Sequence, residues 1–198
     1  ERTADLEDQT GKTALFFGGT PGEREDQLLY NSAQPVGDLN GDGFDDAITS
    51  TSDVEDFEIL TGSSSGYEQT GETLDAFGEP IGFEDFDGDG FEDILFSSGI
   101  RDFFFVAYGA SNLGEMEVRV YQPENGLDRF SYTVGNLDGG GSAEIARLTS
   151  DFSQTYLLQV FAIDESRALT VRQGDEVDGQ LGGGANRRSL SAVDVNGN

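Results

Sequence analysis

The chain has 198 residues, of which 39 are acidic and 11 are basic, and it contains neither histidine nor cysteine. The formal net charge of −28 repels phosphate backbones and anionic lipid surfaces, so neither nucleic-acid binding nor membrane insertion is expected. Without histidine and cysteine the chain has no Ser-His-Asp triad, no thiolate nucleophile, no disulfide and no metal site built from nitrogen or sulfur side chains.

Short alternating or continuously apolar runs predict strands along the whole chain. No window has the pattern of a capped amphipathic helix, although residues 23–30 would fit one or two turns of helix. Residues 2–30 otherwise resemble the last three strands of a repeat unit. In the second whole unit, strands are expected at 80–85, 92–97, 103–108 and 115–121.

One acidic, glycine-rich loop lies between the first two strands of each unit. The equivalent first positions are Asp38, Asp85, Asn136 and Asp194, at spacings of 47, 51 and 58 residues. This period, with four strands per unit, is typical of propeller blades. A sandwich of short strands explains the regular turns, but not the recurrence of one acidic loop at one place in each unit.

The sequence therefore predicts an all-β fold, a β-propeller of four-stranded blades with about four repeat units. The ring is expected to close within one chain, to be shared between two chains, or to be part of a larger propeller. Terminal strands with unpaired edges would favour self-association. The expected units span residues 1–31, 32–78, 79–128 and 129–187, with 188–198 starting or completing a further blade.

The first two loops have the spacing of a calcium-binding loop. Oxygen-bearing side chains fall at positions 1, 3, 5 and 9, a glycine at position 6 permits a sharp turn, and the position 7 carbonyl faces the same centre. Oxygen ligands alone favour a hard cation, and this flexible set suits Ca²⁺ better than Mg²⁺. An EF-hand is not expected, because Thr49 and Phe96 stand where its position 12 glutamate would be. The predicted ligands are Asp38, Asn40, Asp42, Phe44 and Asp46 in the first loop, and Asp85, Asp87, Asp89, Phe91 and Asp93 in the second.

The third and fourth loops depart from this pattern. The third has glycine at position 5 and a longer acid at position 9, so a weak or metal-free site is expected. The fourth reaches the last residue halfway through the motif. Ligand charge ranks the second loop as the tightest site and the first loop next. The weak or partial ligands are Asn136, Asp138, Ser142 and Glu144 in the third loop, and Asp194, Asn196 and Asn198 in the fourth.

Together with the glycine-containing segments 16–19, 59–66 and 107–114, these loops resemble FG-GAP (VCBS-type) repeats. Such repeats build the integrin alpha-subunit propeller and occur in many secreted bacterial proteins. The resemblance covers nearly the whole chain. It implies that the loop joins the first two strands of a blade. It also implies that the Ca²⁺ is structural and lies on the face opposite the usual ligand-binding face.

A calcium-stabilised module for binding or adhesion is the function that this resemblance implies, with a protein or carbohydrate ligand and a place outside the cell or at its surface. The acidic, lysine-poor composition also indicates a saline environment, because such surfaces stay solvated at high salt. The alternatives are a non-catalytic or catalytic part of a secreted polysaccharide-processing enzyme, and a structural subunit of an extracellular assembly. No catalytic residues are expected, because the calcium loops and a solvated surface account for the carboxylates.

Overall fold

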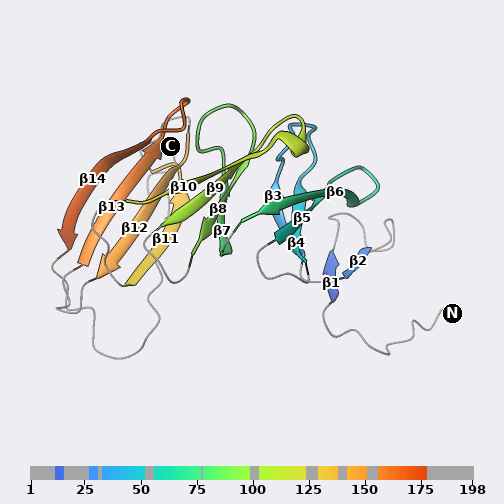
Figure 1. Ribbon diagram of the computed structural model, residues 1–198, viewed down its shortest axis with the longest axis horizontal. Coiled ribbons are helices and arrows are strands. Elements are labelled where there is room, and N and C mark those ends of the chain that lie inside the picture. The colour runs from blue at the N-terminus through green and yellow to red at the C-terminus, as the bar shows by residue number, and fades with distance from the viewer. Residues whose placement is uncertain are drawn as a thin grey trace.

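The computed structural model describes residues 12–15, 27–30, 33–51, 56–76, 78–98, 103–123, 129–137, 142–150 and 156–177. These residues form strands and connecting loops, with one short 3-10 helix, η1 (Leu113–Glu115) (Figure 1). Strands form where β-branched and aromatic residues run between loops rich in glycine and aspartate. Within the same residues, no helix has the length and apolar character needed to cross a membrane. The all-β prediction is confirmed.

Three four-stranded antiparallel sheets follow one another along the chain, and in each the spatial order of the strands is their order in the sequence. The first sheet contains β3 (Ala33–Gly37), β4 (Asp46–Ser50), β5 (Asp56–Thr61) and β6 (Glu68–Asp75). The second contains β7 (Glu79–Glu84), β8 (Asp93–Ser97), β9 (Phe104–Tyr108) and β10 (Glu117–Tyr121). The third contains β11 (Arg129–Gly135), β12 (Glu144–Ser150), β13 (Tyr156–Ile163) and β14 (Leu169–Val177).

A separate two-stranded sheet precedes these three. It pairs β1 (Lys12–Leu15) with β2 (Gln27–Tyr30) in antiparallel register. The helical turns considered for residues 23–30 are therefore wrong for Gln27–Tyr30, which form a strand because they pair with β1. Of the three strands predicted within residues 2–30, β1 and β2 are described; the rest of that unit and the predicted pairing of residues 188–198 lie outside the described residues.

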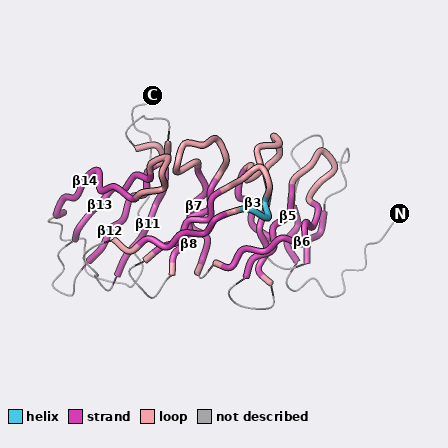
Figure 2. Tube along the Cα trace, turned by 45° about the horizontal axis from the view of Figure 1, so that its top comes forward, coloured by secondary structure: helices cyan, strands magenta, loops and turns pink. Residues whose placement is uncertain are grey.

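The three larger sheets stand in a row in chain order (Figures 1 and 2). Their first strands are neighbours, since β7 contacts β3 on one side and β11 on the other. Neighbouring blades of a propeller also bring their first strands together. The described sheets do not close into a ring, so closure stays a prediction.

The second sheet is buried on both faces, because each of its neighbours covers one of them. Successive side chains of a strand point to opposite faces. Ile94 and Phe96 accordingly pack toward the first sheet, and Leu95 packs toward the third. Strand β9 follows the same alternation, and all five of its residues are buried. Burial on both faces explains why this strand is a continuous apolar run.

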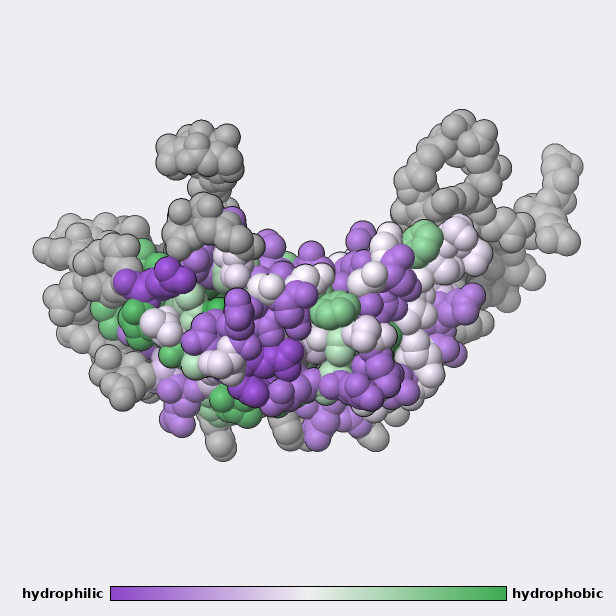
Figure 3. Space-filling model, turned by 90° about the horizontal axis from the view of Figure 1, so that it is seen from above, coloured by the Kyte–Doolittle hydropathy of each residue, from purple (hydrophilic) through white to green (hydrophobic). Residues whose placement is uncertain are grey.

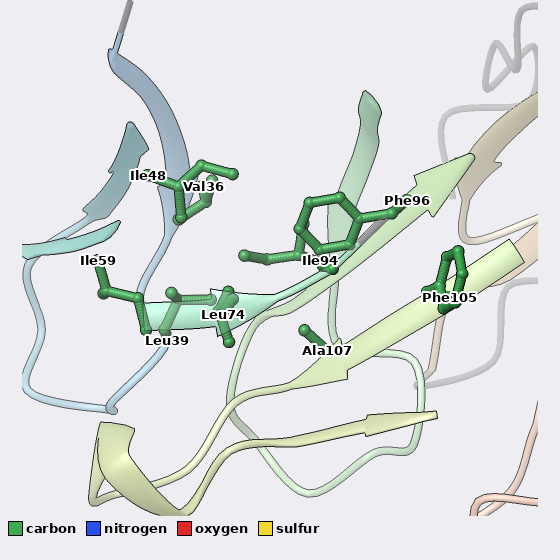
Figure 4. Packing of buried hydrophobic residues seen from close by; sticks show 10 residues of the cluster. Val36, Leu39, Ile48, Ile59, Leu74, Ile94, Phe96, Phe105 and Ala107 are labelled. Atoms are coloured by element: carbon green, nitrogen blue, oxygen red, sulfur yellow. The ribbon is translucent and has the colours of Figure 1, made fainter. Parts of the chain in front are cut away.

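Apolar clusters fill the two spaces between the sheets. Figure 4 shows the cluster between the first and second sheets, where Ile48 and Ile59 face Ile94 and Phe96. The cluster between the second and third sheets centres on Phe104, whose ring lies 5.7 Å from that of Tyr132 and 6.4 Å from that of Phe161. These aromatic side chains pack between sheets, as the alternating pattern predicts.

Candidate cation-binding loops

The acidic loops gather at one edge of the row of sheets, at the top of Figure 1. Loop one (residues 38–46) connects β3 to β4, loop two (85–93) connects β7 to β8, and loop three (136–144) connects β11 to β12. Residues 138–141 of loop three lie outside the described residues. Figure 3 looks down on this edge, where hydrophilic side chains dominate the middle of the surface. Each loop therefore joins the first two strands of its sheet.

Loop one folds around its own position 1 carboxylate. Asp38 accepts backbone hydrogen bonds from Gly41 (2.8 Å), Asp42 (3.1 Å) and Gly43 (2.8 Å). Gly43 at position 6 has φ +90°, a left-handed conformation that glycine adopts readily. The predicted sharp turn at position 6 is present, and it aims three N–H groups at one side chain.

Loop two repeats this turn. The Asp85 carboxylate accepts from the backbone N–H groups of Gly88 (2.7 Å) and Gly90 (3.0 Å). One oxygen of Asp87 accepts from the Asp89 N–H at 3.2 Å, and one oxygen of Asp89 accepts from the Phe91 N–H at 3.0 Å. The backbone of loop two thus leaves the second oxygens of Asp87 and Asp89 without a hydrogen bond from the loop itself.

Three carboxylates meet in loop two. One ligand oxygen from each of Asp85, Asp87 and Asp89 lies within 4.8 Å of the others, a spacing that suits one metal ion. Asp87 is buried, at 3% exposure. Burial, followed by the charges of Asp87 and Asp85, raises the pKa of Asp89, whereas the Phe91 N–H and Arg167 lower it. The acids of this loop are therefore held together against their mutual repulsion.

Loop one has an amide at the matching position 3. The Asn40 side chain donates to one oxygen of Asp42 at 3.0 Å and accepts from the Asp42 N–H at 2.8 Å. Asp42 accepts from the Phe44 N–H at 3.0 Å with its other oxygen. Loop one therefore keeps the backbone path of loop two with one carboxylate fewer.

The position 9 acids close the loops from inside. Asp46, Asp93 and Glu144 are buried, and each accepts the N–H of the position 2 residue of its own loop. The three bonds join Leu39 to Asp46 at 2.9 Å, Phe86 to Asp93 at 2.9 Å and Leu137 to Glu144 at 2.8 Å. The sequence predicted these side chains only as ligands, whereas the structure shows them as acceptors for backbone N–H groups.

The other oxygens of Asp46 and Asp93 accept backbone N–H groups from the residues that directly follow β5 and β9. Gly62 donates to Asp46 and Gly109 donates to Asp93, both at 2.9 Å. Burial raises the pKa of Asp46 to about 6 and that of Asp93 to about 8, against the lowering effect of these hydrogen bonds. A bound cation beside either carboxylate would oppose this rise.

Glycine is required at both donor positions. A Cβ on Gly62 would lie 2.1 Å from the Asp45 carbonyl oxygen, and one on Gly109 would lie 2.4 Å from the Glu92 carbonyl oxygen. The glycines in segments 59–66 and 107–114 thus let the third strand approach the acidic loop. Sequence reasoning used these segments as a resemblance but assigned no contact to them.

Neighbouring loops are hydrogen-bonded to each other in a repeated way. The Asp38 carbonyl accepts from the Glu92 N–H, and the Asp85 carbonyl accepts from the Ala143 N–H, both at 3.1 Å. In both cases position 1 of one loop meets position 8 of the next. Loop three keeps this contact although its ligand set is poorer. The sequence signal for these contacts was that the acidic loop recurs at the same place in each repeat unit.

The remaining predicted ligands fall in three groups. Phe44 is 43% exposed and Phe91 is half-buried, and the role of their carbonyls as ligands stays a prediction. Asn136 is exposed and Ser142 is half-buried at the ends of loop three. The others lie outside the described residues: Asp138, Asp194, Asn196 and Asn198.

An arginine from the third sheet reaches loop two. Arg167, in the turn between β13 and β14, places its Nε 2.7 Å from Asp87 Oδ2 and its Nη2 3.5 Å from Asp89 Oδ2. Its Nη1 lies 3.0 Å from Glu117 Oε2, and its guanidinium lies 4.1 Å from the ring centre of Tyr108. Sequence reasoning missed this residue, because 80 positions separate Arg167 from Asp87 and no motif connects them.

Comparisons with protein-family models, with curated proteins and with solved structures gave no match. The resemblance to FG-GAP repeats therefore stays a prediction, which rests on the loops and the glycine segments.

Proposed function

We propose that this chain is a calcium-binding, calcium-stabilised segment of a β-propeller that serves as a binding or adhesion module outside the cell. The observation that carries the proposal is the meeting of Asp85, Asp87 and Asp89 within 4.8 Å in loop two. Loop one supports it, because the same turn recurs there around Asp38 and Asp42.

The donor set fits Ca²⁺ in chemical type. Carboxylate, amide and carbonyl oxygens are the ligands of this ion, and the chain has no histidine or cysteine to favour a transition metal. Asp85, Asp87 and Asp89 would hold the ion in loop two, with the Phe91 carbonyl and Asp93 as the other predicted donors. Asp38, Asn40 and Asp42 would do so in loop one. The ion would supply positive charge to a set of carboxylates that repel one another.

Stabilisation of the sheets follows from where the loops lie. Each loop connects the first two strands of a sheet and is hydrogen-bonded to the next loop, so an ion that orders one loop also steadies the junction between sheets. A ligand present at a hundredfold excess over its Kd adds about 2.7 kcal/mol to folding stability. The sequence predicts no catalytic residues, and a binding role for the surface agrees with that prediction.

Calorimetric titration with CaCl₂ tests the cation site. We expect Ca²⁺ binding to the wild-type chain, and a loss of affinity of at least about tenfold at one site in Asp89→Asn, since affinity follows ligand charge. Asp75→Asn is the matched control, because Asp75 is exposed on β6 and pairs with Asp56, at the end of β5 opposite the one that reaches loop one. The absence of binding heat in the wild-type chain would contradict the proposal, as would equal losses in both variants.

Binding to glycan and protein arrays tests the recognition role. The calcium-loaded chain is expected to bind a defined subset of ligands, and EDTA is expected to weaken that binding. Release of reducing ends from polysaccharides by the chain alone would instead support the enzyme alternative and contradict the proposed role.

A further inference from the structure

We propose that Arg167 is a built-in competitor for the divalent cation at loop two, so that cation binding there is coupled to release of the β13–β14 turn. The proposal rests on the proposed calcium function of loop two. It concerns one oxygen each of Asp87 and Asp89, which contact an arginine of the third sheet and are also expected to bind the ion.

The guanidinium binds the oxygens that the loop leaves available. Asp87 and Asp89 each give one oxygen to a backbone N–H, and Arg167 contacts the other oxygen of each at 2.7 and 3.5 Å. These two residues also belong to the three-carboxylate cluster. A divalent ion shared by that cluster would lie beside a fixed positive charge, and like charges at such distances repel strongly.

The turn that carries Arg167 is built to hold it there. Arg167 has φ +62°, the one non-glycine residue with positive φ among the described residues. Its carbonyl accepts from the Tyr121 hydroxyl at 2.8 Å and from Arg119 Nη1 at 3.3 Å. The Asp164 carboxylate accepts the N–H groups of Ser166 and Ala168 at 2.9 and 3.0 Å. An unfavourable backbone conformation persists only where surrounding contacts hold it.

Contacts beyond loop two stabilise the guanidinium in the same place. It lies over the Tyr108 ring at 4.1 Å and binds Glu117 at 3.0 Å, and only 21% of its side chain is exposed. Within the described part of the chain, loop one has no comparable partner, since no lysine or arginine there pairs with its acids. Arg167 therefore lowers the cation affinity of loop two and not that of loop one. Ligand charge alone ranks loop two as the tighter site, and Arg167 acts against that ranking.

Removing the charge of Arg167 tests the competition. Calorimetric titration with CaCl₂ is expected to show an affinity at least about tenfold higher at one site in Arg167→Gln than in the wild-type chain. Addition of Asp89→Asn to that variant should abolish the gain, which assigns it to loop two. Arg129→Gln is the control, because it removes the same charge from β11 opposite Ser150, at the end of that strand pair away from the acidic loops. It should change the affinity by less than about twofold.

Reciprocity gives a second readout. If Ca²⁺ and Arg167 oppose each other, Ca²⁺ must raise the melting temperature of Arg167→Gln by more than it raises that of the wild-type chain. Arg167→Lys keeps the charge without the planar fork and should give a smaller gain in affinity. If Arg167→Gln does not fold, Arg167→Lys decides, and an affinity at or below that of the wild-type chain overturns the competition.

The outcomes separate the two proposals. Wild-type binding of Ca²⁺ with an unchanged or lower affinity in Arg167→Gln overturns the competition and leaves the calcium function standing. Failure of every form of the chain to bind Ca²⁺ overturns the calcium function, and the competition with it.

Discussion

Asp93 shows how one residue can link a loop to a sheet. Its two oxygens accept N–H groups from Phe86 in loop two and from Gly109 at the end of β9, and the side chain is fully buried. A buried acceptor that loses its charge or its geometry leaves donors unsatisfied. The role of Asp93 in the fold is therefore separable from any role as a ligand.

Asp93→Asn is expected to destabilise the chain by about 1–3 kcal/mol in the presence of EDTA above about pH 8, where the Asp93 carboxyl is ionised, because the new amide nitrogen would face a backbone N–H. Urea unfolding measures the change. Asp45→Asn is the control, since Asp45 is exposed in loop one, and it should cost less than about 0.5 kcal/mol. Equal effects of the two substitutions would count against a loop-closing role for Asp93.

Gly109→Ala is expected to destabilise the chain by about 1–3 kcal/mol, because the new methyl group would overlap backbone atoms of both loops. The built Cβ lies 2.4 Å from the Glu92 carbonyl oxygen and 2.8 Å from the Leu39 carbonyl oxygen. Gly114→Ala is the comparison, since the atoms nearest its built Cβ belong to the Glu72 side chain and begin at 3.3 Å. Unfolding midpoints that are alike for the two variants would show that the approach of β9 is not tight.

At the level of elements, β9 is the centre of the described fold. It lies inside the second sheet, and its residues face the first and third sheets in alternation. At the edge, backbone hydrogen bonds join loop one to loop two and loop two to loop three, so both junctions between sheets also have a contact between loops. Core packing and loop contacts thus hold the same two junctions, from the middle and from the edge.

Phe104→Ala is expected to cost about 3–5 kcal/mol, because it opens a cavity between the second and third sheets. Phe104 is fully buried and its ring lies 5.3 Å from that of Tyr121. Val120→Thr is the control on the neighbouring strand β10, where Val120 is 61% exposed, and it should have little effect on the urea midpoint. A small effect of Phe104→Ala would mean that the third sheet does not pack on the second as described.

At the scale of the whole molecule, charge opposes the compact state. A net charge of −28 on 198 residues produces self-repulsion, which cations bound at the loops would reduce there and dissolved salt reduces everywhere. The row of sheets places three acidic loops at one edge, which concentrates this repulsion there.

Salt is expected to raise the melting temperature of the EDTA-treated chain. From about 0.01 M to about 1 M NaCl the Debye length falls from about 30 Å to about 3 Å, so repulsion between carboxylates is screened. With saturating Ca²⁺ the same range should produce a smaller rise, because the loops are already neutralised. Scanning calorimetry of both forms checks this, and a salt response that Ca²⁺ does not reduce would contradict it.

Much of the fold was predictable because its signals are local. Alternating and apolar runs marked the four strands of the second sheet, and the recurring loop set their phase. The contacts that define the site could not be predicted from the sequence in the same way. Gly109 is 16 positions from Asp93, and Arg167 is 80 positions from Asp87, so only the stacking of sheets brings them together. Local patterns cannot report a pair that exists only in the folded chain.

Thermal unfolding of the wild-type chain in low-salt buffer tests the claim of calcium stabilisation most directly. The measurement compares EDTA with saturating Ca²⁺, and with Mg²⁺ at equal ionic strength. The account predicts a melting temperature that is clearly higher with Ca²⁺ than with EDTA, and a smaller rise with Mg²⁺. Equal melting temperatures with Ca²⁺ and EDTA would contradict it.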